Sequence, residues 1–184
     1  AALRNIEAGM TAPQSGRFNP HYFDDAALAR AVMIGSVASG NVQVAIRLTE
    51  LDASFTQFED GIWSAVSIAT LFCHVRNASS INELIIETIK DIPQGSLTDI
   101  AVSSALTQSD SIGSSVLETA LFLNTSVCNQ IYSYGNVAHE VLTCVLVILK
   151  MSQGNYDKML SCAAMVPSPG ASVLSLCVSL AAVL

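Results

Sequence analysis

Charged residues are scarce in this chain of 184 residues: Lys, Arg, Asp and Glu make up 12% of it, whereas hydrophobic residues make up 51%. A typical domain has about 25% charged residues, so this chain has few charges with which to cover a free surface. We therefore expect a second copy of the chain or a different partner chain to cover some apolar faces. Flanking sequence is the alternative explanation.

The chain is also poor in basic residues and in long apolar runs. Eight Lys and Arg stand against fifteen Asp and Glu, which gives a net charge of −7, and the basic residues are scattered. Nucleic-acid binding needs clustered basic side chains, and a membrane span needs about 20 consecutive apolar residues. The longest apolar run, residues 141–149, is interrupted by Thr143 and ends at Lys150. The sequence predicts neither a nucleic-acid nor a membrane partner.

The cysteines form no CxxC pair and no metal-ligand spacing. There are five of them, Cys73, Cys128, Cys144, Cys162 and Cys177. Most lie among apolar residues, where a free cysteine behaves as a small buried hydrophobic side chain. An odd number without a disulfide framework indicates a reducing compartment, and we predict a cytoplasmic protein.

Helical spacing of apolar residues fills almost the whole chain, and no strand-like alternation extends beyond four residues. Glycines separate the helical segments as short turns would. The expected helices cover about residues 26–38, 41–50, 59–73, 81–92, 97–106, 114–123, 138–150, 156–164 and 171 onward, with another at the N-terminus. The sequence predicts one all-α domain over residues 1–184, a compact bundle of about nine to ten helices.

The densest polar cluster is "NPHYFDDAALARAV", from Asn19 to Val32. Its carboxylates, Asp24 and Asp25, together with Arg30, could form a site where acidic groups meet a cation or a metal. The favoured alternative is that both aspartates cap a helix and that Arg30 pairs with one of them across a turn.

Two further polar stretches are candidates. "DASFTQFEDG" includes Asp52 and Asp60, whose hard oxygens could hold Mg²⁺, although helix capping explains them equally well. "YSYGNVAHE" brings Tyr134 and Glu140 close in sequence. Aromatic faces beside polar groups suit a nucleoside or sugar pocket, and a turn with half-buried tyrosines is the alternative.

Read in order, the segments "FDDAALARAVMIG", "DASFTQFEDGIWSA" and "YGNVAHEVLTCVLVILKMSQGNYDKMLSCAAMV" resemble the ADP-ribosylglycohydrolase family. The likeness runs through most of the chain. It implies a compact, orthogonal all-α bundle, and it implies a pair of Mg²⁺ ions in active members. It also leads us to expect that the chain is a piece of a larger domain of this type.

In active relatives the loop before the last helix carries two aspartates and a hydroxyl residue. The resemblance places Pro169 and Ala171 at the aspartate positions and Ser172 at the hydroxyl position. The family's other acidic run, Thr-Asp-Asp, does not occur in this chain, and Asp24-Asp25 sit in a different context. A hard dication takes about six oxygen ligands, usually including carboxylates. We therefore expect no metal ligands and no bound cofactor.

These observations predict a non-catalytic member of the family that works as a binding or structural module and could hold a small molecule. The alternative is a hydrolase or a repurposed enzyme that uses the same cleft, with the missing ligands supplied from outside this chain. The candidate cleft residues are Asp24, Asp25, Arg30, Asp60, Tyr134, Glu140 and Ser172.

Overall fold

The structure is a computed structural model, and it describes residues 1–130 and 135–184. The described residues form eleven α-helices, two 3-10 helices and no strand. The α-helices are α1 (Ala2–Glu7), α2 (Gln14–Arg17), α3 (Leu28–Val37), α4 (Val42–Ala53), α5 (Asp60–His74), α6 (Ile81–Ile89), α7 (Leu97–Gln108), α8 (Val116–Ser126), α9 (Ala138–Ser152), α10 (Tyr156–Ala164) and α11 (Gly170–Ala181). The 3-10 helices are η1 (Asp25–Ala27) and η2 (Ser109–Ser111). The all-α prediction is confirmed.

Polar side chains fix where many of these helices begin. Asn41, Ser80, Ser96, Ser115 and Asn155 each accept a hydrogen bond from a backbone N–H in the first turn of α4, α6, α7, α8 and α10. Such caps satisfy backbone donors that have no partner inside the helix. A Ser or Asn placed just before an apolar pattern is a common start signal of a helix.

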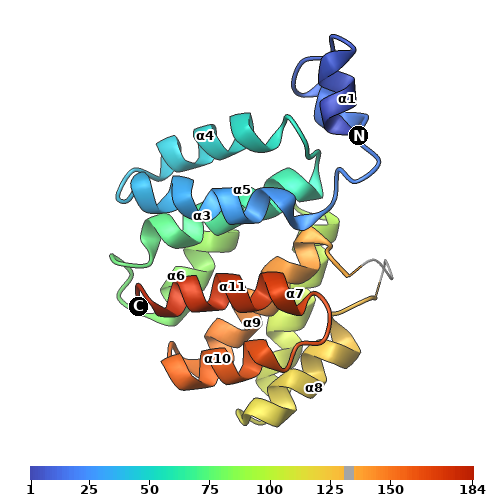
Figure 1. The fold of residues 1–184 in the computed structure, drawn as a ribbon. Coiled ribbons are helices and arrows are strands. Elements are labelled where there is room, and N and C mark those ends of the chain that lie inside the picture. The colour runs from blue at the N-terminus through green and yellow to red at the C-terminus, as the bar shows by residue number, and fades with distance from the viewer. Residues whose placement is uncertain (131–134) are drawn as a thin grey trace.

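Two helices form the centre of the molecule. In α9, every residue from Ala138 to Leu149 is buried, and in α5 the run from Ser64 to Cys73 is buried. Helices α3, α4, α6 and α9 pack around α5, while α7, α10 and α11 pack around α9 (Figure 1). The long apolar run in the sequence is therefore a central core helix.

Helices α3 and α5 approach each other closely at Gly35. A Cβ atom added to this glycine would lie 2.2 Å from the carbonyl oxygen of Ala69 in α5. No ordinary Cβ contact is that short, so the crossing of the two helices requires a residue without a side chain.

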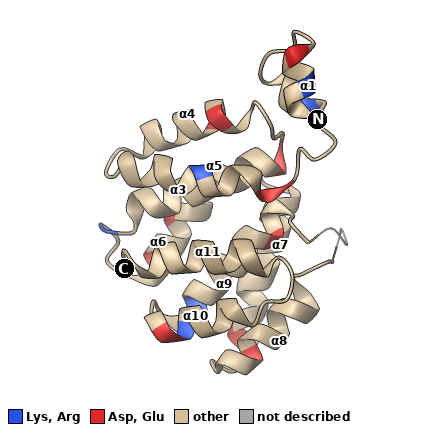
Figure 2. Ribbon diagram, viewed as in Figure 1, with Lys and Arg blue, Asp and Glu red and all other residues tan. Residues whose placement is uncertain are grey.

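Charged residues are sparse along the ribbon, and α11 carries none (Figure 2). Within the described residues, no helix combines the length and the apolar character needed to cross a bilayer. All five cysteines are buried and free, as the sequence predicts.

Candidate functional site

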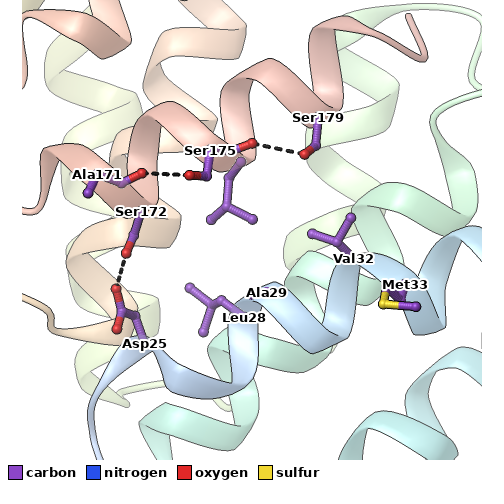
Figure 3. A pocket seen from close by; sticks show the side chains of 10 residues that line it. Asp25, Leu28, Ala29, Val32, Met33, Ala171, Ser172, Ser175 and Ser179 are labelled. Atoms are coloured by element: carbon purple, nitrogen blue, oxygen red, sulfur yellow. Dashed lines mark hydrogen bonds between the residues drawn. The ribbon is translucent and has the colours of Figure 1, made fainter.

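A groove of about 440 Å³ lies between α3 and α11, two helices that are far apart in the sequence (Figure 3). It is lined by Asp25, Leu28, Ala29, Val32, Met33, Ala171, Ser172, Ser175, Leu176 and Ser179. Small side chains and Leu176 on α11 face apolar side chains on α3, and the carboxylate of Asp25 lies at one end. Two of the candidate cleft residues, Asp25 and Ser172, belong to this groove.

Hydrogen bonds within its own turn and to two distant parts of the chain hold Asp25 at the end of the groove. The side chain of Asp24 accepts a hydrogen bond from the backbone N–H of Ala26 at 3.0 Å and begins η1. The backbone N–H of Asp25 donates to the carbonyl oxygen of Asn136 at 3.0 Å. The hydroxyl of Ser172, in the first turn of α11, donates to the Asp25 carboxylate (Figure 3).

The carboxyl group of Asp25 is partly desolvated. Burial raises its pKa above the ordinary value, the hydrogen bond from Ser172 opposes that rise, and the neighbouring charge of Asp24 adds to it. Among the described residues, the ion pairs join Arg30 to Asp52, Lys90 to Glu87 and Lys150 to Asp110, so none of them includes Asp25. The groove therefore ends in a carboxylate that has no cationic partner in the described part of the chain.

Beside Ala171 and Leu176, the rest of the α11 wall carries the hydroxyl groups of Ser175 and Ser179, which are partly satisfied. Ser175 donates to the carbonyl oxygen of Ala171, and Ser179 donates to that of Ser175, both at 2.9 Å (Figure 3). Each hydroxyl oxygen retains lone pairs that can accept from a ligand. Opposite them, Leu28 and Val32 of α3 supply an apolar surface.

Arg30 does not pair with either neighbouring aspartate. Its Nε donates to the Oδ2 of Asp52 in α4 at 2.7 Å, and its Nη1 donates to the carbonyl oxygen of Ala26 at 2.9 Å. The pairing across a turn that the sequence suggested is wrong, because the guanidinium reaches across to α4. The capping role of Asp24 is confirmed, although its cap begins a 3-10 turn.

The other candidate residues lie elsewhere and have separate partners. Asp60 accepts hydrogen bonds at 2.8 Å from both the backbone N–H and the hydroxyl of Thr98 in α7. Glu140 is buried in the first turn of α9 and accepts from the backbone N–H of Asn129 at 3.0 Å. Tyr134 lies outside the described residues. These carboxylates stabilise the junctions between helices.

The residues around the start of α11 do not fit a Mg²⁺ pair. Pro169 is buried and Ala171 is exposed, and neither carries an oxygen in its side chain. The described part of the chain contains no cluster of three His, Cys, Asp or Glu side chains that could hold a metal ion. Asp25 and Ser172 together supply too few hard oxygen ligands for a tight site.

Sequence reasoning did not identify the apolar and serine walls of the groove. The signal on α11 is present in the spacing of Ser172, Ser175 and Ser179, which places three hydroxyls on one helix face. The contribution of α3 has no such signal, because Leu28 and Val32 resemble ordinary core positions.

A family model described as ADP-ribosylglycohydrolase matches residues 1–169. The matched range ends at the residue before α11, so Ser172 lies just beyond it. Comparison with curated proteins and with solved structures finds no match. With a match over most of its length and an all-helical fold, the chain belongs to the ADP-ribosylglycohydrolase family.

Proposed function

We propose that this chain is a non-catalytic member of its family, a pseudoenzyme that binds a small molecule in the groove between α3 and α11. The observation that carries the proposal is the contact between Asp25 and Ser172. It occupies the hydroxyl that the family resemblance assigns to the metal site, while Pro169 and Ala171 stand where aspartates are expected.

Without the metal-ligating carboxylates, the chain would not carry out the hydrolysis that active family members perform. Mg²⁺ would activate water and neutralise substrate charge in such a site. The other candidate carboxylates, Asp60 and Glu140, do not supply a replacement, since the described residues contain no group of three His, Cys, Asp or Glu side chains that could hold a metal ion. The family match ends at residue 169, before α11, and this also supports the proposed loss of the metal site.

The character of the groove favours a ligand with an apolar body and a cationic or hydrogen-bond-donating end. The body would contact Leu28 and Val32. The donor would meet Asp25, whose carboxylate takes part in no ion pair among the described residues. An ammonium group beside a half-buried carboxylate gains more than one in open water, because the local dielectric constant is lower.

Titration of the full chain with benzylamine, and with benzyl alcohol as the neutral comparator, tests this proposal. We expect saturable binding of the amine that is at least about tenfold tighter than that of the alcohol, a difference of about 1.4 kcal/mol. Asp25→Asn should remove the preference, whereas Glu7→Gln in α1 should leave it intact. Equal affinity for both compounds, or hydrolysis of an ADP-ribosylated substrate in the presence of Mg²⁺, would argue for another function.

We also propose that a second copy of the chain covers an apolar stripe on α4. Val44, Leu48 and Leu51 of α4, with Phe55 two residues past its end, lie at helical spacing and are between 42% and 54% exposed. A stripe of this size on one helix is typical of a helix–helix interface. A heterologous partner is the competing outcome.

The expectations of a single domain and of a cytoplasmic location remain part of the proposal. One continuous apolar core joins residues from Ala27 to Leu180, which supports a single folding unit. The five free, buried thiols support a reducing compartment.

A further inference from the structure

A second cavity, of about 160 Å³, lies between α7, the end of α8 and the start of α9. It shares no lining residue with the groove between α3 and α11. Its apolar wall is formed by Leu97, Ile100, Ala101, Ala105 and Val127. Ile100 is 57% exposed, so a small molecule could reach the cavity from solvent without unfolding of the core.

His139 lines this cavity, and its ring nitrogens have no hydrogen-bond partner among the described residues. The side chain is 1% exposed, and neither Nδ1 nor Nε2 makes a hydrogen bond to any described residue. Buried polar atoms are nearly always paired, because an unpaired one loses its bonds to water without replacement. An orphaned imidazole that lines a cavity is therefore a sign of a missing partner.

Burial favours the neutral form of the imidazole, which limits the chemistry of that partner. Burial lowers the pKa of His139, and the nearby charge of Asp60 offsets only part of that effect. A neutral imidazole has one N–H donor and one bare nitrogen acceptor. A hydroxyl group can both donate and accept, so it suits either ring nitrogen in either tautomer.

The remaining features of the cavity fix the size and charge of the ligand. Its volume is close to that of an engineered cavity of about 150 Å³ that binds benzene. Glu140 also lines the cavity, and the described lining contains no Lys or Arg that could pair with an anion. A charged ligand would also lose much of its hydration on entering a largely apolar site.

We propose that this cavity binds a neutral, largely apolar molecule of about the size of benzene that carries one hydroxyl group, and that this hydroxyl hydrogen-bonds the imidazole of His139. Ordered water that satisfies His139 is the competing explanation. In that case an apolar ligand would gain nothing by entering.

Phenol serves as the probe, and benzene as its match without the hydroxyl. The chain has three histidines, so their ring nitrogens can be followed in a long-range ¹H–¹⁵N NMR spectrum and assigned with a His139→Phe variant. We expect phenol to shift the His139 signals saturably and to leave those of His21 and His74 in place. Benzene should bind at least about tenfold more weakly, the effect of one hydrogen bond of about 1.4 kcal/mol.

Two variants separate binding in the cavity from a general surface effect. Ala101→Leu fills the cavity without altering His139 and should abolish phenol binding. Ala164→Leu makes the same change at an exposed position of α10 and should leave binding unchanged. His139→Phe, where it folds, should remove the preference for phenol over benzene.

The proposal would be overturned by His139 signals that do not respond to millimolar phenol, which is the result expected if the site holds water only. It would also be overturned by an Ala101→Leu variant that binds phenol as tightly as the unaltered chain does.

Discussion

The hydroxyl of Ser172 donates a hydrogen bond to the carboxylate of Asp25, although the two residues are 147 positions apart in the sequence. This contact joins the first turn of α11 to the turn that precedes α3 and closes one end of the groove. It ties the serine, which the family resemblance places in a metal site, to a carboxylate from another part of the chain. The contact therefore bears on both the stability and the function of the protein.

The first prediction concerns pH. The pKa of Asp25 in the folded chain lies above its value in the unfolded chain, mainly because of burial, so the folded state binds the proton more tightly. The stabilisation from this group is full below the unfolded pKa and is lost as the pH rises through the folded pKa. We expect Asp25→Asn to raise the free energy of unfolding at neutral pH by less than about 1 kcal/mol.

Denaturant unfolding of Asp25→Asn, measured from acidic to neutral pH, checks this sign. The variant should lose less stability over that interval than the unaltered chain. Glu7→Gln in α1, an exposed carboxylate, should not flatten the profile. An Asp25→Asn variant that is less stable at neutral pH would show that the ionised carboxylate is favourable.

The second prediction concerns the crossing of α3 and α5. Gly35→Ala places a methyl group against the carbonyl oxygen of Ala69, so the helices must move apart, at a cost of about 1–3 kcal/mol. At Gly170 an added Cβ meets no atom within 4 Å, and Gly170→Ala should be neutral or stabilising. Thermal unfolding of the two variants gives the comparison. Equal melting temperatures would contradict the close packing of α3 on α5.

The third prediction separates a structural role of Asp60 from a catalytic one. Asp60→Ala removes both hydrogen bonds to Thr98, which is buried, and should lower the free energy of unfolding by about 1–3 kcal/mol. Asp60→Asn retains an acceptor oxygen and should lose less. Urea unfolding measures both changes. An Asp60→Ala variant with unaltered stability would point away from a structural role.

Local signals in the sequence predict most of the helices, because the caps and the apolar spacing act over a few residues. Helices α6 and α10 begin at Ile81 and Tyr156, where the sequence predicts them, and Ser80 and Asn155 cap them. Helix α2 was missed because it is a single turn without a side-chain cap and contains Gly16. This single turn accounts for the eleventh α-helix, where the sequence predicts about nine to ten.

The candidate site could be predicted only in part, since its contacts join distant segments. Asp25 and Ser172 were both named as candidates, but nothing local connects them. The partner of Arg30 lies 22 residues away on α4, whereas the sequence suggested a neighbour. The orphaned imidazole of His139 depends on how α7, α8 and α9 pack, which no short pattern encodes.

The fourth prediction concerns self-association. Sedimentation of the full chain should show dimers or larger species, because the stripe on α4 exposes large apolar side chains. Leu48→Glu puts a charge into the stripe and should shift the distribution toward the monomer. Gln43→Glu adds the same charge at an exposed position outside the stripe and should not. An ideal monomer over a wide concentration range would contradict the proposed interface.

The measurement that tests the central claim most directly is isothermal titration of the full chain with Mg²⁺ and with Mn²⁺. Pro169 and Ala171 offer no carboxylate, and Asp25 is engaged by Ser172. The account therefore predicts no saturable binding at micromolar concentrations of either ion, the range of ordinary tight sites. A clear isotherm for one or two ions per chain would contradict it and would favour a metal-dependent enzyme.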